Sequence, residues 1–286
     1  MLIVLALGAA LLYGSADFLG GAATRRAALV GVLLTSALAA VAVQLPAALL
    51  AGGSPRAAGI EWGLAGGAAG GIGLMFFYAG LAAGPMSVVS PVAALVSTVL
   101  PVGVAVAQGE RPGPAVYAGV LVCLIATVLV SSGAAGSPAH AEHEWRHRAR
   151  GVALGVASGA AFGLFFLFMR NGGESGALWP ALASRSAGLA IYLTIALVAR
   201  ARPVGWRTGG WPLFAAALGS GALDAGANVC YVLATRAGLF GPAVVLTSLY
   251  PAVTVLLARV ALRERMQRAQ QAGLVLAAVG IVLIAG

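Results

Sequence analysis

Charged residues are scarce in this chain: they make up 9% of its 286 residues, whereas hydrophobic residues make up 60%. A soluble domain of this length needs far more charge on its exposed surface, so the composition excludes an ordinary soluble protein. Lysine is absent, and the 17 basic residues are all arginines, most of which lie between apolar runs rather than in clusters on a polar domain. The net charge of +9 therefore does not indicate a nucleic-acid-binding protein, and we expect no nucleic acid partner.

Cysteine is also rare. Cys123 and Cys230 both lie within apolar segments, where a small packing role is usual and a disulfide is not expected. The sequence has no metalloprotease motif, no cysteine–histidine nucleophile arrangement and no acid-rich diphosphate-binding motif. We therefore expect neither an enzyme nor a bound cofactor.

What the chain has instead is a series of long apolar runs, and its mean hydropathy is +0.97. A helix needs about 20 apolar residues to cross a bilayer, and these runs lack the alternation of barrel strands. We therefore predict an all-α integral membrane protein with ten transmembrane helices. The predicted spans are residues 2–22, 27–51, 60–82, 84–108, 113–133, 151–170, 177–199, 211–235, 239–260 and 267–286.

The second half of the chain repeats the first with an offset of 154 residues. Under this offset Glu110-Arg111 matches Glu264-Arg265, and about a quarter of the positions agree over residues 83–130. A carboxylate is favoured at the start of a helix, so we interpret the two glutamates as helix caps. The predicted organisation is a first five-helix repeat over residues 1–133, a polar linker loop over residues 134–150 and a second repeat over residues 151–286.

Each predicted copy has an odd number of spans, so the second copy must enter the membrane upside down relative to the first. The fold is then two inverted repeats, with Glu110 and Glu264 on opposite faces of the membrane. Most of the arginines in the connections lie on the side away from the N-terminus. By the positive-inside rule, this distribution puts both termini outside and the linker in the cytoplasm.

The linker contains His140, His143 and His147, with spacings that a helical metal site can use. Glu and Arg are interspersed between them, however, and a solvated loop is the simpler interpretation. We expect no metal site.

Three ionisable residues lie well inside apolar spans, where a charge is costly and usually functional: Asp17, Arg185 and Asp224. Arg185 and Asp224 lie at similar depths, roughly 12 and 17 Å from the N-terminal face at 1.5 Å per residue, so we predict that they form an ion pair. Asp17 is then left as a spare carboxylate, one helical turn from Tyr13 on the same face. It is a candidate for binding and releasing a proton during transport; the alternative is an anchor solvated near the headgroups.

A polar stripe runs along the eighth predicted span, where Asp224, Asn228 and Tyr231 recur at spacings of four and three. Tyr231 falls almost where Tyr78 lies in the first copy. Such a stripe can line a cavity and hydrogen-bond a solute, or it can only hold the bundle together. Gln44, in the second span, leaves the same two alternatives open.

These features together resemble the EamA-type members of the drug/metabolite transporter superfamily. The resemblance is carried by ten spans in two copies, by Tyr13-Gly14 in the first span and by Gly109-Glu110-Arg111 after the fourth, and it covers essentially the whole chain. It implies a secondary transporter with a central cavity between inverted copies, moving small metabolites such as amino acids, often outward. This chain departs from the family pattern at Arg263-Glu264, where Gly-Glu is usual, and in its arginine distribution, since family members keep both termini in the cytoplasm.

We therefore predict a multi-pass exporter of a small polar or amphipathic solute in a bacterial-type inner membrane, working by alternating access. Its partners are the solute, the lipid bilayer and, as the first choice of coupling ion, the proton; the oligomeric state stays unassigned. Two alternatives remain, a scaffold subunit that does not transport and a membrane enzyme acting on a lipid-linked substrate. The candidate residues for solute binding or coupling are Tyr13, Asp17, Gln44, Tyr78, Arg185, Asp224, Asn228 and Tyr231.

Overall fold

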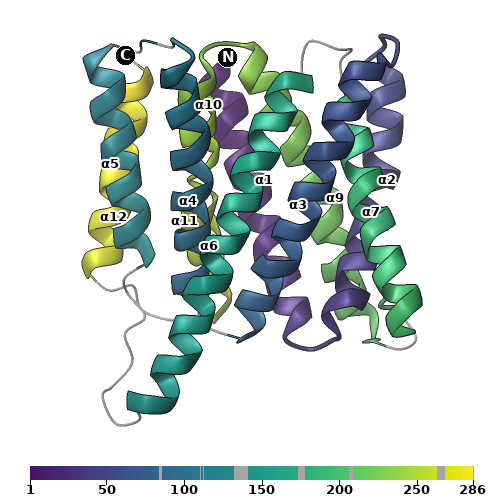
Figure 1. Ribbon diagram of the computed structural model, residues 1–286. Coiled ribbons are helices and arrows are strands. Elements are labelled where there is room, and N and C mark those ends of the chain that lie inside the picture. Colours follow the sequence, from purple (N-terminus) through teal and green to yellow (C-terminus); the bar gives the residue numbers. More distant parts are fainter. Residues whose placement is uncertain are drawn as a thin grey trace.

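A computed structural model describes residues 1–83, 86–109, 111, 113–131, 141–172, 178–205, 209–262 and 268–285. Every regular element within these ranges is an α-helix, as predicted (Figure 1). Six helices of the described ranges are long and apolar enough to cross a membrane: α1 (Leu2–Thr24), α2 (Leu29–Leu50), α3 (Ala57–Ala83), α6 (Ala141–Gly172), α7 (Trp179–Ala199) and α9 (Trp211–Arg236). The other helices are α4 (Met86–Ala107), α5 (Pro114–Ser131), α10 (Phe240–Thr247), α11 (Tyr250–Leu262) and α12 (Arg268–Ala285).

Most of these helices begin and end within a few residues of the predicted spans, but α6 begins at Ala141 rather than at residue 151. The expectation of a loop over the whole of residues 134–150 is therefore wrong from Ala141 onward. This part of the chain is rich in alanine, glutamate and arginine, which favour helix. Glu142 also precedes Arg146 by four residues, a spacing and order that stabilise a helix.

The ninth predicted span, residues 239–260, is not one helix. It is divided into α10 and α11 by a turn at Ser248 and Leu249. Pro251 has no N–H to donate to the carbonyl of Thr247, four residues earlier, so the regular hydrogen-bond pattern stops there. The prediction of an uninterrupted span was wrong because a single proline inside an apolar run does not show whether the helix bends or breaks.

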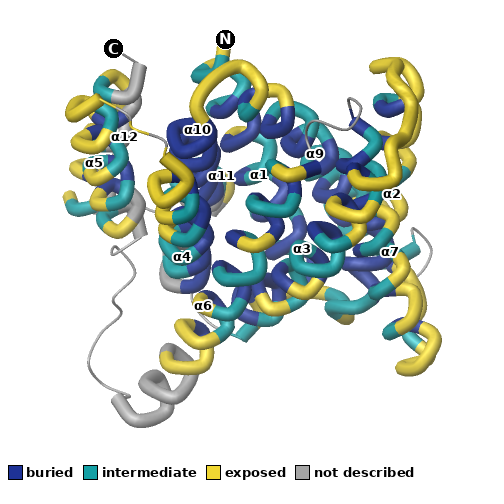
Figure 2. Tube along the Cα trace, turned by 45° about the horizontal axis from the view of Figure 1, so that its top comes forward, coloured by how far each residue is buried: buried dark blue, intermediate teal, exposed yellow. Residues whose placement is uncertain are grey.

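The helices of the two halves of the chain pack against each other (Figure 1). α3 packs on α6 and α7, α1 packs on α9 and α11, and α2 packs on α7 and α9. α5 and α12 form a pair at one edge of the bundle, and both chain ends lie at the same end of it. Figure 2 shows that buried residues face inward while the outer surface is exposed. Much of this exposed surface is apolar, as at Leu197 and Val198, which fits lipid as the surrounding solvent.

Glycines allow the central helices to cross closely. α3 crosses α7 at Gly67, where an added Cβ would collide with the backbone of Ser184. α9 crosses α2 at Gly221, where an added Cβ would collide with the backbone of Ser36. Small residues at such crossings let helix backbones approach within a membrane, where packing rather than hydrophobic burial drives association. The two crossings bring α2, α3, α7 and α9 together inside the bundle.

Candidate functional site

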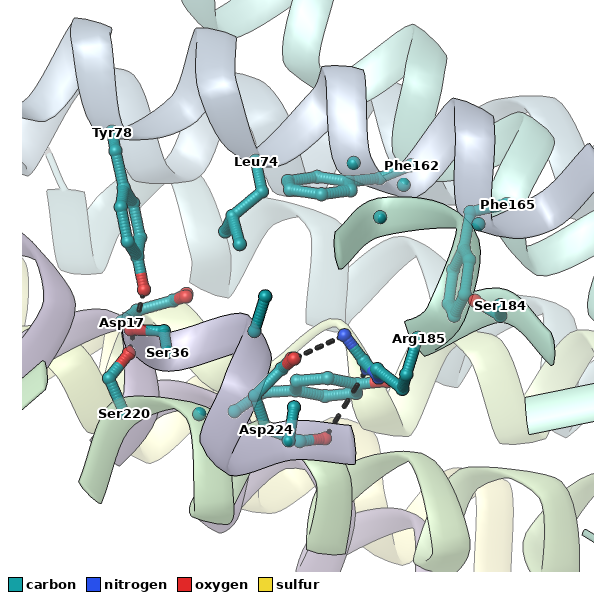
Figure 3. Close-up of a pocket in the computed structure, with 18 of the residues that line it drawn as sticks. Asp17, Ser36, Leu74, Tyr78, Phe162, Phe165, Ser184, Arg185, Ser220 and Asp224 are labelled. Carbon is teal, nitrogen blue, oxygen red and sulfur yellow. Dashed lines mark hydrogen bonds and ion pairs between the residues drawn. The ribbon is translucent and has the colours of Figure 1, made fainter. Parts of the chain in front are cut away.

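A cavity that is partly open to its surroundings lies at these crossings. Its walls come from α1, α2, α3, α6, α7 and α9, with one residue each from α4 and α11 (Figure 3). Glycines at the crossings contribute no side chains, and this leaves the space open. The polar side chains in the wall are Tyr13, Asp17, Ser36, Tyr78, Ser97, Ser184, Arg185, Tyr192, Ser220, Asp224 and Tyr250.

An ion pair joins α7 to α9 across the cavity. The Nη1 atom of Arg185 contacts the Oδ2 atom of Asp224, and the Nη2 atom lies 3.5 Å from the carbonyl oxygen of the same residue. The side chains are 17% and 20% exposed, respectively, so the pair borders the cavity rather than bulk solvent. The predicted pairing of these two residues is confirmed. Two opposite charges that must leave water are tolerated together, because each compensates the other.

Asp17 lies in the same cavity, near its opposite end in Figure 3. The residue is 9% exposed, and within the described part of the chain its carboxylate makes no ion pair or hydrogen bond. Tyr78 and Ser220 lie beside it, and their hydroxyls are 2.8 Å apart. Asp17 also interacts electrostatically with Asp224. It is therefore a carboxylate inside the bundle that faces the cavity, not an anchor at the headgroups.

Aromatic residues form much of the remaining wall. Tyr13 and Tyr250 pack edge-on with ring centres 6.4 Å apart, and both hydroxyls are buried without a hydrogen-bond partner among the described residues. Tyr192 donates a 2.8 Å hydrogen bond to the carbonyl oxygen of Gly71. Phe165 lies on the opposite wall, in α6 (Figure 3). The two free hydroxyls are hydrogen-bonding groups that a polar solute can satisfy.

Three of the predicted residues do not line the cavity. Gln44 is fully buried, and within the described part of the chain neither polar atom of its amide group has a hydrogen-bond partner. Asn228 donates to the carbonyl oxygen of Asp224 at 3.1 Å, and Tyr231 donates to that of Phe166 at 3.4 Å. The predicted stripe on α9 is thus divided, with its first member in the cavity and the next two in helix packing.

The fold brings several residues to this site that were not predicted from the sequence. Ser220 lies one turn before Asp224 and extends the same stripe, and Tyr192 lies two turns after Arg185, so helical spacing alone could have indicated both. Tyr250 could not be found in this way, because it follows the unforeseen break between α10 and α11.

Other residues singled out from the sequence lie outside the described part of the chain. These are Glu110, Glu264, His140 and the side chains of His143 and His147. Among the residues that the structure does describe, no group of histidines, cysteines or acids is arranged to hold a metal ion.

The site is thus a cavity inside the helix bundle that combines an internal ion pair, a separate carboxylate, free hydroxyls and aromatic rings. Such a combination is typical of a pocket that orients a small molecule by a few polar contacts within a mostly apolar wall. Buried polar groups of this kind inside spanning helices mark solute or ion pathways in membrane proteins.

Comparisons with known proteins give a family and a fold. The model of the EamA-like transporter family matches residues 149–286. The fold is shared with solved structures, of which 25 chains match. One of them, a crystal structure, has a TM-score of 0.71 and 22% sequence identity, and the match covers 97% of this chain and 98% of that one. No curated protein sequence matches the chain.

Proposed function

We propose that this chain, which belongs to the EamA-like transporter family, carries a small polar or amphipathic solute through the central cavity. The family and the six apolar helices identify a multi-pass membrane protein of the transporter type. The observation that carries the proposal is the cavity between the helices with the Arg185–Asp224 ion pair and the carboxylate of Asp17 in its wall. A protein that only packs against partners gains nothing from charges held inside its own bundle.

The proposed architecture is an inverted repeat, with copies over residues 1–133 and 151–286 joined by a linker. In its support, the first helix of each copy packs on the third helix of the other. α1 runs antiparallel to α9, because Leu12 lies beside Gly226 and Leu19 beside Gly219. α6 runs antiparallel to α3 in the same way. Since α1 and α3 are separated by two reversals of the chain, α1 and α6 run in opposite directions, as inversion requires.

The crossings at the cavity support the same symmetry. α7 crosses α3 at Gly67, and α2 crosses α9 at Gly221. These two glycines are separated by 154 residues, the offset found in the sequence. Each glycine faces a serine on the second helix of the other copy. A cavity between two such copies is where secondary transporters of this design bind their solutes.

Transport in this proposal proceeds by alternating access, with one copy rocking against the other. The break between α10 and α11 is a place where such a motion can be accommodated, because a helix with interrupted hydrogen bonds bends at lower cost than a continuous one. Tyr250 follows the break directly and lines the cavity. A movement at the break would therefore shift Tyr250, a residue in the wall that surrounds the solute.

We further propose that the proton is the coupling ion, that Asp17 carries it, and that the direction is outward across a bacterial-type inner membrane. The support for Asp17 is its place in the cavity without an ion pair among the described residues. The direction and the membrane rest on the family resemblance. A carboxylate that can change its charge inside the bundle couples proton movement to solute movement.

The test is solute flux in proteoliposomes against a panel of amines, amino acids and other small metabolites, with and without a pH gradient. We expect flux of at least one solute, faster with the gradient. Protein-free liposomes and the Arg185→Glu variant serve as controls. If the folded protein moved no solute from a broad panel under either condition, the scaffold alternative would replace this proposal.

A further inference from the structure

The wall of the cavity carries one more negative charge than positive charge. Its acids are Asp17 and Asp224, and Arg185 is the only basic residue among the described lining residues. Arg185 is paired with Asp224, so these two charges compensate each other. Asp17 makes no ion pair or hydrogen bond within the described part of the chain. The cavity therefore presents one uncompensated carboxylate to whatever it contains.

Aromatic rings lie near this carboxylate. Tyr13 is one helical turn from Asp17 and packs edge-on against Tyr250. Phe162 and Phe165 border the same space from α6 (Figure 3). The face of an aromatic ring is electron-rich and attracts cations, and ammonium groups are recognised in proteins by rings combined with a carboxylate. The rings and the charge therefore favour the same kind of ligand.

We propose that the solute is an organic ammonium ion, namely an amine with an apolar alkyl or aryl body and no carboxylate of its own. This inference rests on the proposed transport function and specifies its substrate class. The ammonium group lies against Asp17, where Tyr78 and Ser220 offer hydroxyl oxygens beside it. The apolar body lies against Leu74 and Phe162, which line the same cavity.

An amino acid fits this cavity less well than the amine. Its carboxylate needs a positive partner, and Arg185 is already bound by both the side chain and the carbonyl oxygen of Asp224. What remains for a solute is the unpaired Nε atom of Arg185 and the hydroxyls of Tyr13 and Tyr250. These groups can donate hydrogen bonds, but they bring no net charge that could compensate a carboxylate.

A neutral solute also fits less well. When Asp17 is ionised, a neutral solute would leave its carboxylate without a counter-charge inside the bundle, and an uncompensated charge away from water is costly. An ammonium ion removes this cost on binding, and it brings a charge that the rings of Tyr13 and Tyr250 attract. The charge of the solute, more than its size, is therefore the property that this cavity selects.

The experiment compares three ligands that share one body: phenethylamine, phenylalanine, which adds a carboxylate, and 2-phenylethanol, which lacks the charge. Binding to the purified full-length protein in detergent is measured by calorimetry at neutral pH, where the amine is charged. We expect phenethylamine to bind at least about tenfold more tightly than either of the other two, since partly desolvated charge pairs contribute that much or more.

Asp17→Asn keeps the shape of the side chain and removes its charge. We expect it to reduce phenethylamine binding by about tenfold or more and to leave 2-phenylethanol binding unchanged. Glu61→Gln is the matched control, because it makes the same chemical change at an exposed position of α3 outside the cavity, and it should bind like the unmodified protein. If Asp17→Asn does not fold, Asp17→Glu tests the same point, since it retains the charge and should retain selectivity for the amine.

The outcomes separate this inference from the transport proposal. Equal or tighter binding of phenylalanine, or undiminished amine binding by folded Asp17→Asn, overturns the assigned substrate class. Flux of another solute in proteoliposomes would then leave the transport function standing. Conversely, selective amine binding without flux of the bound amine supports the cavity chemistry and contradicts transport.

Discussion

At the residue scale, the first helices of the two proposed copies contribute side chains of different charge to the cavity wall. α1, the first helix of one copy, places Asp17 in the cavity wall, whereas α6, the first helix of the other copy, places Phe162, Phe165 and Phe166 there. One copy thus supplies a carboxylate where the other supplies a ring. The backbone symmetry is not a symmetry of the site.

The Arg185–Asp224 pair should be exchangeable as a unit. Removing one partner of a buried pair leaves an uncompensated charge, a cost of about 3–5 kcal/mol, so Arg185→Glu and Asp224→Arg should each abolish flux and lower the unfolding temperature. The double reversal restores opposite charges across α7 and α9 and should recover more flux and stability than either single variant. A double variant no better than the worse single one would mean that the pair acts through something other than its charges.

Asp17 should determine how flux depends on pH. Asp17→Asn cannot gain or lose a proton, so an imposed pH gradient should no longer accelerate flux in proteoliposomes. Glu61→Gln removes an exposed carboxylate and should retain the acceleration. If folded Asp17→Asn responded to the gradient as the unmodified protein does, another group would have to carry the proton.

At the element scale, the sequence predicted much and missed two features for physical reasons. A long run of apolar residues strongly indicates a membrane-spanning helix, so the positions of most helices were predicted to within a few residues. The start of α6 at Ala141 was missed because a polar segment that favours helix carries no hydropathy signal. The break before Tyr250 was missed because a proline in an apolar run does not always interrupt the helix. Pro46 lies within the continuous helix α2, whereas Pro251 lies next to the interruption between α10 and α11. The Arg185–Asp224 ion pair could be predicted from the depths of the two residues in the membrane. The tyrosines in the cavity wall could not all be predicted, because helix crossings that the sequence does not show bring them together.

The crossings themselves can be tested with alanine. Gly67→Ala and Gly221→Ala place a methyl group against the backbone of Ser184 and Ser36, which cannot move aside as a side chain can. Overpacking of this kind costs about 1–3 kcal/mol, so thermal unfolding should occur at lower temperature. Gly103→Ala is the control, because its Cβ meets nothing within 4 Å in α4, and it should be neutral or slightly stabilising. Equal unfolding temperatures for all three variants would show that these helices do not cross as closely as described.

Pro251 should control motion rather than binding. Pro251→Ala supplies the N–H that the carbonyl of Thr247 lacks and favours joining α10 to α11. We expect slower flux with unchanged solute affinity, measured in proteoliposomes and by calorimetry. Pro46→Ala, in the continuous helix α2, should change neither. Slower flux accompanied by equally weakened binding would instead indicate that Pro251 only shapes the cavity.

At the scale of the whole molecule, inversion has a consequence that can be measured without any solute. The connection between α2 and α3 and the connection between α7 and α9 occupy equivalent places in the two proposed copies. Inverted copies must expose them on opposite sides of the membrane. Ser54 and Arg202 lie in these connections and are exposed, so each can be replaced by a cysteine after Cys123 and Cys230 have been changed to alanine.

A membrane-impermeant maleimide added to intact, uniformly oriented vesicles should label only one of Ser54→Cys and Arg202→Cys, and the other should react only after the membrane is permeabilised. The arginine distribution predicts that Ser54 lies outside, on the side of the N-terminus, whereas the family resemblance predicts that it lies in the cytoplasm. The residue that reacts first decides between these orientations, because the chemistry of the label is the same at both positions. Labelling of both cysteines from the same side would contradict the inverted repeat itself. The cavity would then have to be understood as a feature of a single bundle and not as the meeting place of two opposed copies.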